Sequence, residues 1–569
     1  MAASATRAEG VAGVSRGAVR TAMGHLGVGC LATWPMVEAP ASRLIGHPFV
    51  DVWNHAWGAW WFWDSLSQGA LPLHTRLLGA PSGGYLWYID PIGALATAPL
   101  VPVLGVVAAW NVLVLAYVTL ASVAGRGLAL ALGASATSSW VGAVATAVSP
   151  YLLSEIHNGI SEAVGVCWSV FALAALARAG AADGRRRDWA MAGLWGGLTA
   201  VGTVYYALGL ALAALPLALH AAWRRPREGT LGILTAALVA AAIAVPTFLL
   251  VRITLGDPAG ALIGRPDAPL SNPAIFGILA HNAVDPRSFF VPGEFQSVDV
   301  SRYGEFFLHT SYVGWVALCL ALWGRRWLVL GAATLPLVFS LGPFLYYDGD
   351  FVRHGARLVD LPYRLLFEVL PTSALGHPQR AGFPGLALLY GLAAATLARA
   401  RPPVVSILAL AVAGEALLLS PAAWPIARTA PWDDASAVHV REAVARQPDR
   451  AGIVLDLPGD VPGSGMTTSR YLLLQATHGL PLPYSPDVRV AACKLQDTSA
   501  RALLQRLPSA DRVVTAASLH AAGVRWVVLH GDLADVSTEE RVLTPVLGEP
   551  ERFGEVAVYP VTLSDPGGP

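Results

Sequence analysis

The stretch around which this chain is organised reads Gly46-His-Pro-Phe-Val-Asp51-Val-Trp-Asn-His55-Ala-Trp-Gly-Ala-Trp60-Trp-Phe-Trp-Asp64. At 3.6 residues per turn, one face of a helix would carry Trp53, Trp57, Trp60 and Trp61. The polar face would carry Asp51, Asn54, His55 and Gly58. Indole rings favour a membrane surface because they combine an apolar body with one N–H donor. The pattern predicts an interfacial helix whose tryptophans rest among lipid headgroups and whose polar face presents an acid.

The composition is that of a membrane protein. Of 569 residues, 54% are hydrophobic and 13% are charged, against about 25% charged residues in an average soluble domain. Lys plus Arg equals Asp plus Glu at 38 each, so no excess of basic charge indicates nucleic acid as a partner. Three of the four cysteines, Cys30, Cys167 and Cys319, lie in apolar segments, and Cys493 stands alone. This spacing favours neither a disulfide framework nor a metal cluster.

Apolar windows long enough to cross a bilayer recur up to about residue 420, since a crossing helix needs about 20 mostly apolar residues. They predict roughly eleven spans, at 20–37, 92–124, 132–150, 158–178, 188–203, 205–223, 230–252, 308–323, 327–342, 382–398 and 403–420. Pro99 and Pro102 indicate that the second window begins with a separate segment at the outer surface. The first window could also be a signal peptide, but the many spans after it favour an uncleaved first crossing.

The arginines predict the orientation, because cytoplasmic loops carry excess Lys and Arg. Clusters such as Arg185-Arg-Arg187 and Arg224-Arg225 fall on alternate connections. The N-terminus is therefore expected in the cytoplasm of a plasma-membrane protein. The connections 38–90, 254–307 and 343–381 are expected outside, with everything after the last span. The fold class is mainly α: a polytopic transmembrane bundle over residues 1–430 with a small α/β domain.

That extracytoplasmic α/β domain is predicted over residues 431–569, after a linker marked by Pro421, Pro425 and Pro431. Strands are expected at 452–457, 525–529 and 555–559, and helices at 438–445, 468–477 and 501–507. About 135 residues are enough to bury a core of their own.

Polar residues that could carry chemistry gather on the predicted outer side. Asp51 and His55 lie one helical turn apart. Asp90 precedes Pro91, where it could serve chemistry or only cap a helix, since Asp caps well and Pro suits the first helical position. Glu155 and His157 lie in a short hairpin that also holds Ser161 and Glu162. The alternative is that Ser161 only caps a helix and the polar residues form a solvated turn.

A late outer loop holds His377, Arg380 and Arg364. The planar guanidinium of arginine suits phosphate because it donates paired charge-assisted hydrogen bonds. The alternative for Arg380 and Arg364 is an interfacial anchor that extends to the headgroups. No GxxxxGK[ST] loop, HExxH helix or GxSxG elbow occurs, so ATP-driven transport, zincin proteolysis and α/β-hydrolase chemistry lack support.

Several of these motifs together resemble the multi-pass GT-C glycosyltransferase superfamily, and more closely its bacterial members with an extracytoplasmic α/β tail. The membrane part contributes Asp51, Pro81-Ser-Gly-Gly with Ile89-Asp-Pro91, Ser149-Pro-Tyr with His157-Asn-Gly and Glu162, Tyr312-Val-Gly-Trp315, and His377-Pro-Gln-Arg380. The tail contributes Ile453-Val-Leu-Asp-Leu-Pro458, Arg470-Tyr-Leu-Leu-Leu-Gln-Ala-Thr-His478 and Gly523-Val-Arg-Trp-Val-Val-Leu-His530. The resemblance covers most of the chain, although each motif is loose.

The resemblance implies transfer of a sugar from a polyprenyl-phosphate donor to an envelope glycan, lipid or protein on the outer face. Asp51 would be the general base, with Asp90 as a second catalytic acid. His55, Glu155 and His157 would shape the acceptor site, while Arg380, with His377 and Arg364, would contact the donor phosphate. The chain departs from the family in two places: Asp51 lacks a neighbouring acid, and the late motif lacks one arginine. Some members use a divalent metal, so the resemblance leaves open a metal held by Asp51, Asp90 and Glu155.

Two other functions remain open on the sequence. A transporter or flippase of lipid-linked glycans would use the same outer arginines without a base, and it would need a polar path through the spans, for which Glu415 is the main intramembrane charge. A non-catalytic envelope scaffold would bind glycan or a partner through its tail.

Overall fold

The computed structural model describes residues 16–256, 260–262, 273–292, 307–370, 375–446, 452–459, 467–484 and 514–562. The first half is helical: α1 Arg16–Ala32, α2 Val52–Ser67, α3 Pro91–Thr97, α4 Val101–Leu104, α5 Val106–Ala131, α6 Ser139–Ala147, α7 Pro150–Asn158, α8 Ser161–Val164, α9 Cys167–Gly180, α10 Arg186–Gly202, α11 Val204–Arg224 and α12 Pro226–Leu255. The later membrane part contains α13 Pro273–His281, α15 Trp315–Trp323, α16 Trp327–Phe339, α17 Phe383–Thr396 and α18 Pro402–Leu419.

Short elements connect these helices. They are the 3-10 turns η1 Met36–Glu38, η2 Ala98–Leu100, η3 Pro286–Phe289, η4 Pro362–Glu368 and η6 Pro378–Gly382, and the strand pairs β1 His74–Thr75 with β2 Gly84–Tyr85, β3 Tyr346–Tyr347 with β4 Asp350–Phe351, and β5 Arg353–His354 with β6 Arg357–Leu358. The helix is interrupted at Gly105, whose φ is +78°. This break confirms that the window at 92–124 begins with separate short segments, α3 and α4, before the long helix α5.

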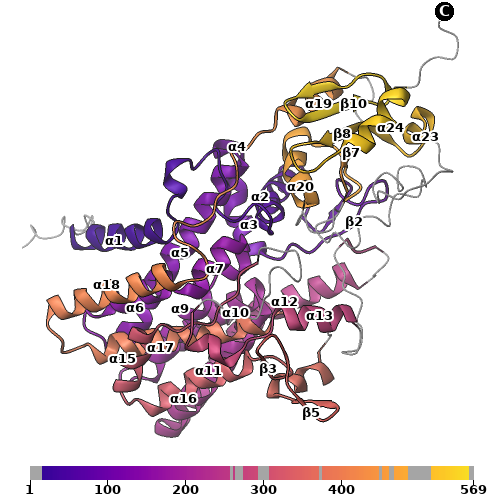
Figure 1. The fold of residues 1–569 in the computed structure, drawn as a ribbon. Coiled ribbons are helices and arrows are strands. Elements are labelled where there is room, and N and C mark those ends of the chain that lie inside the picture. Colours follow the sequence, from indigo (N-terminus) through magenta and orange to yellow (C-terminus); the bar gives the residue numbers. More distant parts are fainter. Residues whose placement is uncertain are drawn as a thin grey trace, which may run out of the picture.

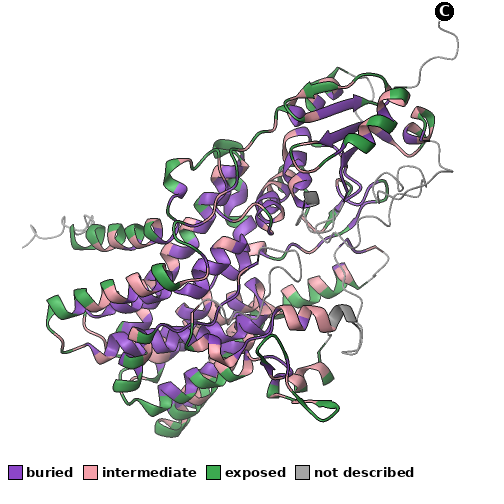
Figure 2. Ribbon diagram, in the orientation of Figure 1, coloured by how far each residue is buried: buried purple, intermediate pink, exposed green. Residues whose placement is uncertain are grey.

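Within the described residues, five helical segments are long and apolar enough to cross a membrane: Val106–Ala131, Ser161–Gly180, Val204–Arg224, Pro226–Leu255 and Pro402–Leu419. The window at 308–323 is only partly helical, because α15 begins at Trp315 and residues 307–314 precede it without regular structure. Buried residues concentrate where the helices meet, and exposed ones lie along the outer helices such as α12 and α18 (Figure 2). The total number of crossings stays a prediction.

The C-terminal part contains the expected strands and, within the described residues, the helices expected at 438–445 and 468–477 (Figure 1). A mixed sheet has the order β7-β8-β10-β9, in which β7 Ile453–Leu457 pairs parallel with β8 Val524–His530 and the antiparallel strands are β10 Val556–Pro560 and β9 Glu551–Phe553. The helices are α19 Ala435–Ala445, α20 Thr467–His478, α23 Ala516–Ala521 and α24 Ser537–Leu547. The helix expected at 501–507 lies outside the described residues. The division of the chain near residue 430 stays a prediction.

Helix α2 forms as predicted, but the lipid-facing position expected for its tryptophans is wrong. Trp57 and Trp61 are 0% and 1% exposed, and Trp53 is 6% exposed. The indole N–H of Trp57 donates to the side-chain oxygen of Gln475, 3.0 Å away, in α20. Helix α20 of the C-terminal part lies against α2 (Figure 1). Protein therefore covers the side of α2 that carries Trp57, where lipid was expected.

The predicted linker runs along the loop that precedes α2, to which it is hydrogen-bonded. The amide of Gly46 donates to the carbonyl of Ala427 at 2.9 Å, and the amide of Leu44 donates to the hydroxyl of Thr429 at 3.1 Å. Further along, the amide of Trp432 donates to the carbonyl of Ser42 at 2.6 Å. These bonds fix the entrance to α2 from the side of the C-terminal part.

Candidate functional site

Asp51 lies at the N-terminus of α2, where its side chain is half-buried and does not cap the helix. The loop before it is held against the end of α7, since the amide of His47 donates to the carbonyl of His157 at 2.7 Å. Gly159 follows α7 with φ +65°, and a Cβ atom built there would lie 2.6 Å from the Cβ of Val52. The close approach needs a glycine and brings the start of α2 against the hairpin that carries Glu155 and Glu162.

A buried ion pair forms the centre of the site. Arg380, in η6, donates through Nη1 to Oε1 of Glu162, in α8, at 2.9 Å, and both side chains are at most 5% exposed. The Nδ1 atom of His55 lies 3.0 Å from the hydroxyl of Ser161 and 3.6 Å from Oε2 of Glu162. The Nε atom of Arg380 is buried without a hydrogen-bond partner among the described residues. The guanidinium therefore keeps a donor for a ligand.

Glu155 lies within the electrostatic reach of the same pair. It is 1% exposed, and burial raises the pKa of its carboxyl to about 7, with Glu162 adding to the rise and Arg380 opposing it. A carboxyl with this pKa changes its protonation state near neutral pH, which favours a role in proton transfer. Its helix begins with a Ser149 cap and a proline at the first position.

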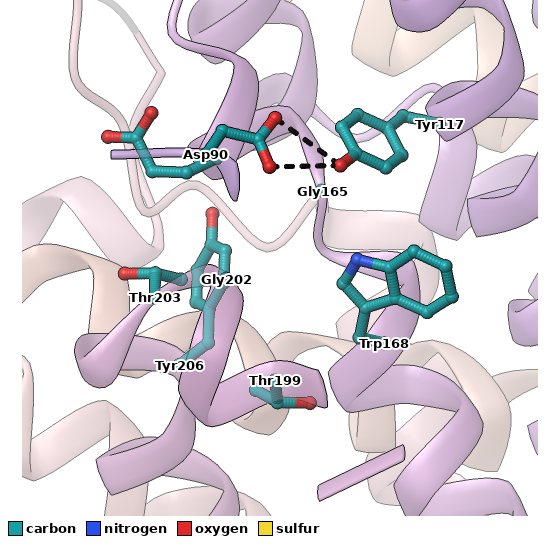
Figure 3. A pocket seen from close by; sticks show the side chains of 9 residues that line it. Asp90, Tyr117, Gly165, Trp168, Thr199, Gly202, Thr203 and Tyr206 are labelled. Carbon is teal, nitrogen blue, oxygen red and sulfur yellow. Dashed lines mark hydrogen bonds between the residues drawn. The ribbon is translucent and has the colours of Figure 1, made fainter. Parts of the chain in front are cut away.

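Asp90 has the capping role that its position before Pro91 predicted. Its Oδ1 accepts from the amide of Gly93 at 2.9 Å and from the hydroxyl of Tyr117 at 3.1 Å. Burial raises the pKa of Asp90 to about 6, and the charge of Glu162 contributes to the rise. Asp90 and Glu162 line one pocket with Tyr117, Trp168 and Tyr206 (Figure 3).

Tyr88, two residues before Asp90, joins this segment to α2, although the sequence did not single it out. Its hydroxyl donates to the backbone carbonyl of His55 at 2.6 Å. Burial raises the pKa of Tyr88, and the negative charges of Asp90, Glu162 and Asp51 raise it further. The three acids therefore act on one phenol through their charge, although they are far apart in the sequence.

The other predicted residues lie around this centre with different exposures. His157 is half-buried and stacks on His47 with ring centroids 4.9 Å apart. The Nδ1 atom of His377 lies 2.8 Å from the side-chain oxygen of Asn282. Arg364 lies 3.7 Å from Glu368 of its own turn and is 35% exposed. The anchor alternative is wrong for Arg380, which is buried in an ion pair.

Sequence reasoning named Glu162 in the hairpin but gave it no role. The sequence signal for a role of Glu162 was its spacing of seven residues, two helical turns, from Glu155. The turn at Gly159 nevertheless places the two acids in separate helices. Among the described residues, no three His, Cys, Asp or Glu side chains converge to hold a metal ion. Asp51, Asp90 and Glu155, the residues proposed as metal ligands, are not such a group in the described part of the chain.

Solved structures share this fold, whereas no family model and no curated protein sequence matches the chain. The arabinofuranosyltransferase AftD from Mycobacteria superposes on 97% of the chain with a TM-score of 0.52 and 16% sequence identity, and the chain spans 40% of AftD. ArnT from Cupriavidus metallidurans bound to undecaprenyl phosphate gives 0.48 and 14%, over 97% of this chain and 99% of ArnT. The oligosaccharyltransferase AglB from Archaeoglobus fulgidus, in complex with an inhibitory peptide and a dolichol-phosphate, gives 0.48 and 12%, over 94% and 72%.

These proteins are GT-C glycosyltransferases, and the chain has a GT-C-like fold. The assignment rests on AftD, and at this identity it concerns the fold alone. The resemblance first seen in loose motifs is confirmed at that level.

Proposed function

We propose that the chain is a membrane glycosyltransferase that moves a sugar from a polyprenyl-phosphate donor to an envelope acceptor on the extracytoplasmic face. The observation that supports the proposal is the half-buried carboxylate of Asp51 at the start of α2. The next residue, Val52, lies against Gly159 in the hairpin that carries Glu162 of the Glu162–Arg380 pair. AftD, with the same fold, is named an arabinofuranosyltransferase. ArnT and AglB were solved with a polyprenyl phosphate bound.

The reaction balances with these groups. The acceptor hydroxyl is a poor nucleophile, so a carboxylate within reach accepts its proton while the oxygen bonds to the anomeric carbon. The bond from that carbon to the phosphate oxygen breaks, and the electron pair leaves with the polyprenyl phosphate. Arg380 stabilises the added charge on the leaving phosphate. Asp51 takes the proton, because Asp90 is already bonded to Gly93 and Tyr117.

His55, Glu155 and His157 then surround the acceptor end of the site. His55 holds Ser161 and Glu162, and thereby the hairpin to which Asp51 is joined. His377 and Arg364 lie in the same late outer loop as Arg380. His377 supports the donor side through Asn282, whereas Arg364 is directed to Glu368.

The flippase alternative has weaker support because both carboxylate oxygens of Glu415 already accept hydrogen bonds from the protein. Its Oε1 accepts from the hydroxyl of Tyr312 and the amide of Trp315, each at 2.6 Å, and its Oε2 accepts from the amide of Val316 at 3.1 Å. Glu415 thus satisfies the start of α15 instead of lining a free polar path. The scaffold alternative is an outcome of the test.

The test is an Asp51→Asn variant, with Asp64→Asn at the other end of α2 as the matched control. Membranes that contain each variant receive radiolabelled polyprenyl-phosphate sugars, and transfer to envelope material is counted. Loss of a general base lowers the rate by about 10²- to 10⁴-fold, so Asp51→Asn should lose transfer at unchanged protein level while Asp64→Asn retains it. Full transfer by Asp51→Asn would remove Asp51 as the base. Wild-type membranes that transfer none of the sugars would favour the scaffold.

A further inference from the structure

The three sequence motifs of the C-terminal part meet at the carboxyl ends of two parallel strands. Asp456 lies near the end of β7, and His530 is the last residue of the neighbouring strand β8. The Nε2 atom of His530 lies 2.8 Å from Oδ1 of Asp456, and both side chains are at most 3% exposed. The ring of His530 stacks on Tyr471 of α20, with centroids 4.7 Å apart. The proposed transfer uses none of these residues.

A chain of charged side chains leads from this buried pair to α2. The Nδ1 atom of His530 lies 3.8 Å from Oδ1 of Asp532. The other carboxylate oxygen of Asp532 accepts from Nη1 of Arg470, in α20, at 2.6 Å. The guanidinium of Arg470 in turn lies over the ring of Trp53, with Cζ 6.0 Å from the ring centroid. A cation over the negative face of an indole is attracted to it, so the sheet holds a residue of α2 that follows Asp51 by two positions.

Trp53 fixes the backbone in front of Asp51. Its indole N–H donates to the carbonyl of Pro48 at 2.7 Å. The ring is 6% exposed, and its centroid lies 5.9 Å from that of Trp432, just after the linker. Asp51 lies between Pro48 and Trp53 in the sequence. One buried indole therefore holds the chain on both sides of the proposed base.

Gln475 makes a second contact, one helical turn further along α2. Its Oε1 accepts from the indole N–H of Trp57 at 3.0 Å, and its Nε2 donates to the carbonyl of Leu77 at 2.6 Å. The side chain is fully buried, so a lost partner would leave a buried polar group unsatisfied. The backbone of residues 77–80 is also hydrogen-bonded to that of residues 482–484. Helix α20 thus joins α2 to the loop that follows it.

We propose that α20 fixes the position of Asp51, and that Arg470 and Gln475 are positioning residues that act through two tryptophans of α2. The inference rests on the proposed function, since it assigns a task in the same reaction to the C-terminal part. Asp51 makes no capping hydrogen bond at the start of α2, so the placement of this first turn relies on contacts with other elements. Trp53 and Trp57, one turn apart on the same face, supply two of these contacts.

The test compares variants of the full-length protein in nanodiscs. Arg470→Met removes the guanidinium, and Gln475→Leu removes the acceptor of the Trp57 indole. Backbone amides of residues 48–58 should exchange with deuterium at least about tenfold faster in both variants, because local opening becomes easier. Sugar transfer should lose about tenfold or more in kcat at an unchanged KM for the donor, because the base is displaced. Arg470→Lys, which keeps the charge, should recover part of both losses.

Two control variants separate positioning from a general loss of stability. Val558→Ala removes buried methyl groups from β10, which is separated from β7 by β8. Arg446→Met removes an exposed arginine at the end of α19. Both should leave the exchange of residues 48–58 and kcat unchanged.

Unchanged exchange in Arg470→Met and Gln475→Leu, with both variants folded, would overturn the inference. Faster exchange with wild-type kcat would also overturn it, because Asp51 would then not depend on α20. If wild-type membranes transfer no sugar, faster exchange in the two variants alone would still support the anchoring of α2 by α20, and only the proposed function would fail.

Discussion

At the scale of single residues, Glu155 links the stability of the protein to pH. The pKa of its carboxyl is raised to about 7 from an ordinary value of 4.5, with burial as the largest cause. Between these two values the folded protein binds more protons than the unfolded chain, so stability falls as pH rises through this window and levels off above it. One pKa unit corresponds to about 1.4 kcal/mol, so ionising Glu155 costs about 3 kcal/mol in the folded protein.

A Glu155→Gln variant should therefore lose less thermal stability than the wild type between about pH 5 and about pH 8. The amide keeps the shape of the side chain and does not ionise. The measurement is the Tm of the detergent-solubilised protein across this range. Glu442→Gln, at an exposed position of α19, should reproduce the wild-type profile. Parallel profiles for the wild type and Glu155→Gln would show that Glu155 ionises at an ordinary pKa.

The individual residues of the centre were predictable to different degrees. Asp51, Glu155 and Arg380 stood out because charged side chains are rare in an apolar sequence and must have a partner or a function. The pairing of Arg380 with Glu162 was not predictable, because the two residues are 218 positions apart and no local pattern joins them.

At the scale of elements, the contact between α2 and the turn after α7 sets the position of Asp51. Gly159 has a φ of +65°, and an added Cβ would meet the Cβ, Cα and N atoms of Val52 within 3 Å. A non-glycine residue in this conformation costs about 1–2 kcal/mol, and the overlap with Val52 must also be relieved by moving α2. Misplacing a reacting group by about 1 Å can lower a rate by about 100-fold.

Gly159→Ala should therefore reduce sugar transfer far more than its loss of stability explains. The matched control is Gly479→Ala, because Gly479 has a φ of +71° but no neighbouring atom within 4 Å of an added Cβ. That variant carries the backbone strain without the displacement of α2. Transfer rates and Tm are measured for both. Equal transfer rates in the two variants would show that the position of α2 does not depend on this contact.

For helix α2, the sequence pattern predicts the helix and its apolar face but not what covers that face. The period of 3.6 predicted the helix and its indole face correctly. The same period cannot say whether that face meets lipid or protein, since both are apolar surroundings. The covering helix, α20, lies about 400 residues later, and its Gln475 accepts from the Trp57 indole and donates to the carbonyl of Leu77. The strands of the C-terminal sheet were easier to predict, because each is a short buried run bounded by turn residues.

At the scale of the whole molecule, the contacts place the site and the C-terminal sheet on the same side of the helical part. Helix α20 packs on α2, and the strap at 420–432 is bonded to the loop that precedes Asp51. The segment Ser161–Gly180 starts beside Glu162 and is 20 residues long, which gives about 30 Å at 1.5 Å per residue. If this segment crosses the membrane, its far end, with Arg178 and the loop before α10, lies on the side opposite the site.

The arginine-rich end should be cytoplasmic, because positive residues are retained on that side, and this orientation would put the site and the sheet outside. The test introduces Ser537→Cys in α24 or Ala182→Cys in the loop after α9, both at exposed positions, into a chain whose own cysteines are replaced by serine. A membrane-impermeant maleimide should label the first in intact spheroplasts and the second only after permeabilisation. The reverse pattern would place Asp51 in the cytoplasm, and the proposed transfer on the outer face would then fail even if every contact within the site is correct.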